Sequence, residues 1–165
     1  MAGNTRFRPK HNGSVPAEPD RKTRYCFGGD ESLLDEYAWS YSNAIVRNEV
    51  YGHRVGQKKA NAWGLFDMHG NIWEWCRDHY AVTLTGGKDP DVRDGGSFRR
   101  SEGGPYRVIR GGCYHEVVPR CRSGIRQRGE PEFQGPHLGF RVALSAVRQT
   151  SPAATRVEGT GAPDK

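Results

Sequence analysis

The chain has 165 residues, of which 35% are hydrophobic and 27% charged, and its formal net charge is +6 at pH 7. With glycine counted in place of tyrosine, the apolar fraction is about 44%, near that of ordinary globular domains, which excludes disorder along the whole chain. No apolar run is long enough to cross a membrane, and the first thirty residues lack the apolar core of a secretory signal, so a cytoplasmic location is expected.

The positive charge is concentrated in two stretches. Residues 1–24 carry a net charge of +4 and residues 100–128 a net charge of +5, whereas residues 25–99 carry −3. The arginines of residues 120–128 have no aromatic residues between them, which favours a solvated arginine face over a nucleic-acid-binding surface. Neither a nucleic acid nor a membrane is therefore an expected partner.

Composition divides the chain into three parts. Residues 1–24 are polar and contain prolines without any periodicity, which predicts a disordered lead-in. Residues 145–165 have the same character and predict a disordered tail. The folded part is expected to be one domain, residues 25–144, without internal repeats.

One helix and three strands are predicted within this domain. Asp30 can cap a helix whose apolar residues recur at helical spacing as far as Tyr41. Alternating residues predict strands at Ile72–Cys76, at Arg120–Arg128 and at Phe140–Leu144, the last with Arg141 pointing outward. The sequence therefore predicts an α+β fold with little regular secondary structure and long loops.

Three segments are specific enough to be compared with known families. They are Asn61–Trp75 (NAWGLFDMHGNIWEW), Arg107–Gly112 (RVIRGG) and Leu138–Arg141 (LGFR). Their order and wording closely resemble the formylglycine-generating enzyme, or sulfatase-modifying factor, family. Two further segments, Tyr25–Gly28 and Leu34–Trp39, are similar to its bacterial members. The resemblance implies a C-type-lectin-like fold with bound calcium. It also implies the oxygen-dependent oxidation of a sulfatase cysteine to formylglycine by copper held on two cysteines.

The chain departs from this family in two ways. The family's front half carries an Arg-Leu-Pro-Thr-Glu-x-Glu-Trp-Glu segment that is absent here, so the domain is expected to be N-terminally truncated, with an unpaired sheet edge open to association. The resemblance also places the two copper cysteines at positions 116 and 121. Cys121 is present, but the other position is Glu116, and Cys113 stands where the family has serine. Cys113 and Cys121 meeting across a loop would be the only route to a two-sulfur copper site.

A calcium site is expected in the loop before the first predicted strand. The resemblance maps it onto Asp67, Glu74 and the carbonyls of Gly70 and Ile72. Calcium readily combines carboxylates with backbone carbonyls, and the Gly70-Asn71 turn can aim carbonyls inward. The alternative is that Asp67 caps a turn and Glu74 pairs with an arginine.

Other candidate residues have open interpretations. The resemblance places Trp73 beside the active site, but a core position is an equal alternative. Nearby arginines would lower the pKa of Cys121, whereas core filling opposite Ile125 is the simpler interpretation. Cys26 and Cys76 are expected to be buried thiols. His115 lies near Cys113 and Cys121, but the histidines show no zinc-binding spacing.

Two functions remain open. In the first, the domain is a non-catalytic module that binds calcium and a protein or peptide ligand. In the second, it is an oxidase that converts the cysteine of a Cys-x-Pro-x-Arg peptide to formylglycine, with Cys121 and Cys113 holding copper and Trp73 and Glu116 lining the groove.

Overall fold

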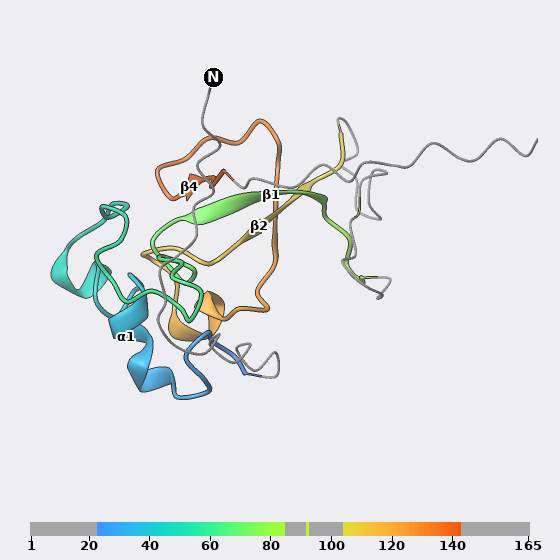
Figure 1. Cartoon of the computed structure of the whole chain (residues 1–165). Helices are drawn as coiled ribbons and strands as arrows, with labels where there is room; N and C mark the ends of the chain where they lie inside the picture. The colour runs from blue at the N-terminus through green and yellow to red at the C-terminus, as the bar shows by residue number, and fades with distance from the viewer. Residues whose placement is uncertain (1–22, 85–91, 93–103, 143–165) are drawn as a thin grey trace, which may run out of the picture.

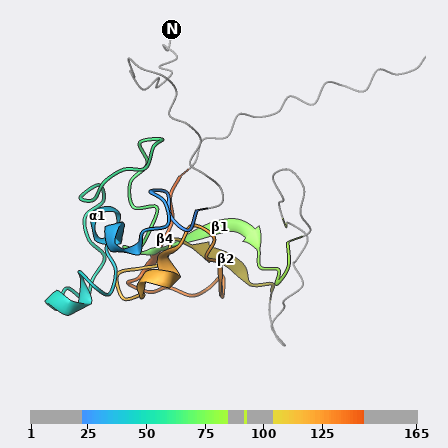
Figure 2. The ribbon, with the colours of Figure 1, turned by 90° about the horizontal axis from the view of Figure 1, so that it is seen from below.

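The chain forms a four-stranded mixed sheet with short helical turns at one end. The computed structural model describes residues 23–84, 92 and 104–142. The strands follow the order β3-β2-β1-β4, with β1 at Trp73–His79, β2 at Arg107–Arg110, β3 at Gln127–Gly129 and β4 at Leu138–Gly139. β1 pairs antiparallel with β2 and parallel with β4, and β2 pairs antiparallel with β3. Figures 1 and 2 both show the helical segments beside one end of β1 and β2. The α+β class with little regular structure is confirmed.

The two flanking segments predicted from composition fall almost entirely outside the described residues. The described part begins at residue 23 and ends at residue 142. Within it, no helix is long and apolar enough to cross a membrane.

The predicted helix is present but much shorter than its apolar pattern. The 3-10 helix η1 (Glu31–Leu33) begins after Asp30, whose side chain accepts a hydrogen bond from the Ser32 N–H as predicted. The α-helix α1 (Leu34–Tyr37) follows and ends at Ala38, which is extended. The helix ends there because the next residue, Trp39, forms a parallel bridge with Gly70. A second 3-10 helix, η2 (Ile45–Arg47), lies further along the chain.

The strand predicted at Ile72–Cys76 is confirmed as β1. Its alternation turns Trp73 into the core, where it is only 3% exposed. Trp75 lies over β3 at Gly129, where an added Cβ would come within 2.5 Å of the indole ring. A glycine at position 129 is therefore what allows the Trp75 ring to cover this part of the sheet.

The strand predicted at Arg120–Arg128 is wrong for most of its length. The first part is the 3-10 helix η3 (Val118–Cys121), and only Gln127–Gly129 forms a strand. Pro119 occupies the first turn of η3, where its fixed φ suits a helix and its missing N–H costs nothing. A hydrogen bond from the Ile125 N–H to the Arg122 carbonyl then closes a turn. The arginines consequently do not share one face of a strand.

The third predicted strand is reduced to the two residues of β4. Phe140 and Val142 follow it and are 73% and 88% exposed, so they do not form an inward-facing set, and Leu144 lies outside the described residues. This prediction was also wrong, because the chain leaves the sheet after Gly139.

The core consists of two clusters of buried side chains. One contains Tyr25, Leu34, Ala38 and Cys121, and the other contains Trp73, Cys113 and Ile125. They approach one another at Gly112, whose φ is +81° and where an added Cβ would lie 2.9 Å from the Cys121 sulfur. The two buried thiols therefore lie where the two clusters meet, and Cys121 packs with Leu34 rather than opposite Ile125.

Candidate functional site

The loop before β1, residues 66–72, has three residues in the left-handed region of backbone conformation. Asp67, Gly70 and Asn71 have φ values of 55°, 67° and 63°, a conformation that side-chain-bearing residues rarely adopt. Two backbone hydrogen bonds fix the loop: the Gly70 N–H donates to the Gly111 carbonyl at 2.8 Å, and the Asn71 N–H donates to the Trp39 carbonyl at 2.7 Å. The loop is thus clamped between the end of β2 and the segment after α1.

Asp67 offers one oxygen with no bound donor. Its carboxylate is buried, and Oδ2 accepts a hydrogen bond from the Gly56 N–H at 2.8 Å. Oδ1 is also buried and has no hydrogen-bond partner among the described residues. A buried anionic oxygen without a donor is costly, so this atom is an acceptor that a cation or a water molecule would satisfy.

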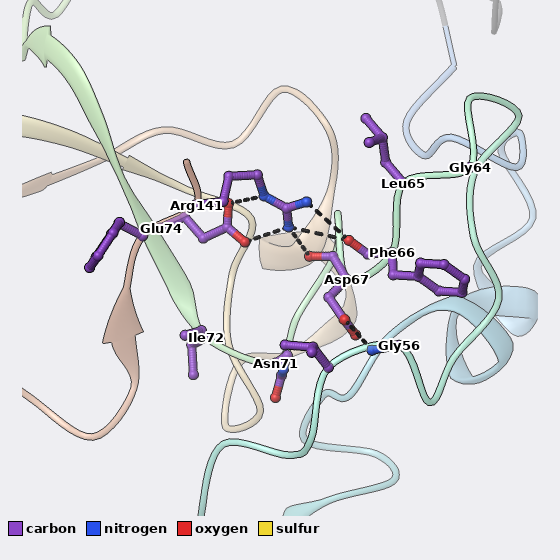
Figure 3. Close-up of a pocket in the computed structure, with 11 residues that line it drawn as sticks. Gly56, Gly64, Leu65, Phe66, Asp67, Asn71, Ile72, Glu74 and Arg141 are labelled. Carbon is purple, nitrogen blue, oxygen red and sulfur yellow. Dashed lines mark hydrogen bonds and ion pairs between the residues drawn. The ribbon is translucent and has the colours of Figure 1, made fainter. Parts of the chain in front are cut away.

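Glu74 is held by an arginine. Arg141 donates from Nε to Oε2 at 2.6 Å and from Nη2 to Oε1 at 2.5 Å, and it also donates to the Phe66 carbonyl at 3.2 Å (Figure 3). The Glu74 carboxylate raises the pKa of Arg141. Arg141 is exposed, as expected, but its guanidinium folds back onto β1, because the Glu74 carboxylate and the carbonyls of Phe66 and Asp67 accept its hydrogen bonds.

Three of the four predicted calcium ligands lie in the loop and Glu74 lies in β1, and the two carboxylates face different partners. Figure 3 shows the Asp67 carboxylate directed toward Gly56 and the Glu74 carboxylate directed toward Arg141. Gly70 and Ile72 lie between them in sequence, on the clamped turn. The structure therefore shows the arginine pairing of Glu74, while the unpartnered Asp67 oxygen remains open to a cation.

A cavity of about 390 Å³ lies over this loop. Its lining includes Asp67 and the Glu74–Arg141 pair. Its walls are largely apolar side chains exposed to solvent, among them Val55, Leu65, Phe66 and Phe140.

A second cluster of potential ligands lies at the turn after β2. The side chains of Cys113, His115 and Glu116 place one sulfur, one nitrogen and one oxygen within 4.8 Å of one another. The Cys113 sulfur is 3.4 Å from Nε2 of His115, and Glu116 forms an ion pair with Arg120 at 2.7 Å. Cys113 is buried and His115 is exposed, so the cluster extends from the core to the surface.

Both thiols at the centre of the molecule are hard to ionise. Burial raises the pKa of Cys113 to about 11, although a hydrogen bond from the Trp73 side chain opposes the shift. Burial, followed by the charges of Cys113 and Glu116, raises the pKa of Cys121 to about 12. The expectation that arginines lower the pKa of Cys121 is therefore wrong, because desolvation and negative neighbours outweigh the contribution of Arg120. All four cysteines are free thiols.

Trp73 contributes to the core. Its ring packs with Cys113 and Ile125, and its side chain hydrogen-bonds the Cys113 sulfur. The structure thus brings Trp73, Cys113, Glu116 and Cys121 together, with the tryptophan beneath the cluster rather than in an open groove.

His69 is a residue that sequence reasoning missed. It is 2% exposed, its Nε2 accepts a hydrogen bond from the Cys26 N–H at 3.1 Å, and its Nδ1 lies 2.7 Å from the Cys121 carbonyl. Since Nε2 accepts, Nδ1 must carry the proton and donate it. No spacing in the sequence indicates this role, because its partners lie 43 and 52 residues away.

The residues do not fit a two-cysteine copper site of the kind that the resemblance implies. Copper(I) favours soft sulfur ligands as thiolates. One of the two implied positions is Glu116, which is engaged with Arg120, so only Cys121 supplies a sulfur at these positions.

Comparison with known proteins places these observations in a family. Residues 12–146 match the family described as "Sulfatase-modifying factor enzyme 1-like domain". The formylglycine-generating enzyme of Mus musculus is 33% identical across 72% of this chain. The serine/threonine-protein kinase pkn1 of Chlamydia caviae is 34% identical across 51% of this chain. Among solved structures, Treponema denticola variable protein 1 matches with a TM-score of 0.59 and 32% identity over 75% of this chain.

The chain spans less than half of each of these proteins. It covers 40% of the mouse enzyme, 13% of the kinase and 41% of the Treponema protein. Their names denote different activities, so likeness to them fixes the fold and the family rather than a reaction.

Proposed function

Because the chain belongs to the family of the sulfatase-modifying factor enzyme 1-like domain, we propose that it is a divergent formylglycine-generating-enzyme-like module, one that binds calcium and a protein or peptide ligand and does not oxidise cysteine. The observation that carries this proposal is the state of the implied copper position. Glu116 occupies one of its two positions and is ion-paired with Arg120, and the remaining thiol, Cys121, is fully buried.

The calcium part of the proposal depends on Asp67. Its Oδ1 is a buried oxygen with no partner among the described residues. Carbonyls of Gly70 and Ile72, together with the Glu74 carboxylate, would complete an oxygen set of the kind that calcium accepts. A carboxylate has about four lone-pair sites, so Glu74 can bind a cation while Arg141 occupies two of them. A bound calcium ion would add positive charge beside these carboxylates and would link the loop to β1.

The ligand-binding part of the proposal depends on the cavity above this loop. Val55 and Phe140 at its rim are 75% and 73% exposed, and Leu65 and Phe66 are 44% exposed. Apolar surface gathered around a cavity of this size is typical of a site that receives an apolar side chain of a partner. Arg141 also lines the cavity, but its guanidinium is engaged with Glu74, so the apolar side chains carry this part of the proposal.

The experiment that tests this proposal is an oxidation assay on a synthetic Cys-x-Pro-x-Arg peptide. The full chain is incubated with Cu(I) and oxygen, and an intact formylglycine-generating enzyme serves as the positive control. We expect the peptide mass to stay unchanged with this chain, since Glu116, paired with Arg120, stands at one of the two implied copper positions. Conversion of the peptide to the aldehyde would overturn the proposal.

The alternative function is the copper-dependent oxidase itself. It is favoured by one observation: Cys113 and Cys121 lie close enough for the charge of one to raise the pKa of the other. In this alternative the two thiols form an improvised pair, and Cys113→Ser abolishes any conversion. A Glu116→Cys variant that gains conversion while the wild type has none would instead show that Glu116 blocks an otherwise complete site.

A further inference from the structure

We propose that Cys113, His115 and Glu116 form a site for a divalent transition-metal ion, with Zn²⁺ as its probe. The three side chains contribute a sulfur, an imidazole nitrogen and a carboxylate oxygen, all within 4.8 Å of one another. This proposal goes beyond the calcium-binding module and does not depend on it, because the two sites share no residue.

The spacing of two of these atoms already suits a metal ion. Zn²⁺ bonds of about 2.0–2.3 Å separate neighbouring tetrahedral ligand atoms by about 3.3–3.8 Å. The Cys113 sulfur and Nε2 of His115 lie 3.4 Å apart. A Glu116 carboxylate oxygen lies within 4.8 Å of both atoms, so the ion would have to draw this oxygen closer.

The backbone holds the three residues on one turn. The Glu116 N–H donates to the Cys113 carbonyl at 3.0 Å, and the Tyr114 N–H donates to the Asn71 carbonyl at 2.8 Å. The first bond closes the turn, and the second fixes it to the loop before β1. The ligands are therefore arranged before any ion arrives, which reduces the entropy lost on binding.

The three ligand atoms, one sulfur, one nitrogen and one oxygen, determine which metal ion the site prefers. A mixed sulfur, nitrogen and oxygen set suits Zn²⁺, whereas Ca²⁺ and Mg²⁺ require oxygen ligands, and a single sulfur is poorly matched to Cu(I). Three protein ligands leave one position of a tetrahedral ion for water. His115 is exposed, so this position is reached from solvent.

The neighbours of the cluster leave its ligand atoms available. Arg120 pairs with Oε2 of Glu116 at 2.7 Å, and a carboxylate has a second oxygen for the ion. His137 lies beside His115, with ring centres 4.9 Å apart in an edge-to-face arrangement. The imidazole of His115 is thus packed on one side, which limits its rotation away from the thiol.

The test is a Zn²⁺ titration of the full chain by calorimetry, with calcium in excess and a reductant that does not bind metal. We expect one ion per chain. Cys113→Ser, His115→Ala and Glu116→Gln should each weaken binding at least tenfold, since loss of even a residue that orients a ligand typically costs ten- to a hundredfold. Cys76→Ser and His79→Ala, which remove the same residue types from β1, should leave affinity within about threefold.

Cobalt(II) substitution identifies the sulfur ligand directly. We expect a sulfur-to-cobalt charge-transfer absorption in the near ultraviolet that is lost in Cys113→Ser and retained in Cys76→Ser. Because Cys113 is buried and its replacement can impair folding, the exposed His115→Ala variant decides the matter by itself. Undiminished Zn²⁺ affinity in His115→Ala, or a cobalt spectrum without sulfur ligation in the wild type, would overturn the proposal.

Discussion

At the scale of single residues, His69 links stability to pH. Burial lowers its pKa below the ordinary value of 6.5, and its neutral form accepts from the Cys26 N–H while donating to the Cys121 carbonyl. Below pH 6.5 the unfolded chain binds a proton that the folded chain resists, so this contribution is present above 6.5 and is lost as the pH falls through the lower folded-state pKa. We therefore expect acidification from neutral pH to destabilise the fold.

His69→Gln isolates this effect. Loss of two buried hydrogen bonds should lower the free energy of unfolding by about 1–3 kcal/mol at pH 7. The variant should also lose much of the difference in stability between pH 7 and pH 5, which urea denaturation at both values measures. A variant as acid-sensitive as the wild type would show that His69 is not the titrating group.

The motifs predicted which residues form the candidate site, but they did not predict the burial of these residues or the pKa of the Cys121 thiol. Counting from Gly112 located Glu116 and Cys121, and the structure brings both into one region with Cys113. The protonation of Cys121 depends on burial beside Tyr25 and Leu34, which are remote in sequence. The sequence nearby contains arginines, and their proximity along the chain suggested the opposite shift.

At the scale of structural elements, the contact between the loop before β1 and the segment after α1 depends on Gly70. Its φ is +67°, and an added Cβ would lie 2.0 Å from the Trp39 carbonyl oxygen. Gly64 has a similar φ of +76° but has no atom within 4 Å of that position. Both replacements by alanine incur the left-handed cost of about 1–2 kcal/mol, and only Gly70→Ala also forces two backbones apart.

The pair of variants separates conformational strain from steric exclusion. We expect Gly64→Ala to unfold at a slightly lower urea concentration than the wild type. Gly70→Ala should be at least twice as destabilised in free energy, or fail to give a cooperative transition. Equal losses in the two variants would mean that the Trp39–Gly70 bridge contributes nothing to stability.

The elements themselves were predictable where local signals agreed with long-range contacts. Alternation at Ile72–Cys76 found β1, because that strand is paired along its two edges with β2 and β4. Alternation at Arg120–Arg128 misled because Pro119 and the turn at Ser123-Gly124 set the backbone there. The helix at Asp30 had the correct start and the wrong end, since its end is fixed by the bridge to Gly70.

At the scale of the whole molecule, few elements are regular, and stability depends on how loops are tied to the sheet. The two core clusters meet at two thiols, and the loop before β1 contacts β2, η3 and the segment after β4. A cation bound at Asp67 would join this network in the loop whose residues are hydrogen-bonded to Gly56, Trp39 and Gly111. Calcium is therefore expected to act on global unfolding rather than on one loop.

A thermal unfolding curve in calcium and then in chelator measures this effect. A ligand that binds only the folded state adds about 2.7 kcal/mol at a hundredfold excess over its Kd, enough to raise Tm by several degrees. Asp67→Asn keeps an oxygen for the Gly56 N–H but removes the anionic charge, so it should fold and lose the calcium response. His115→Ala should keep that response in full, because the proposed zinc site is separate. A calcium shift of equal size in Asp67→Asn would place the ion elsewhere. A Tm blind to calcium in the wild type would contradict the calcium part of the proposal and leave the Asp67 oxygen to a water molecule.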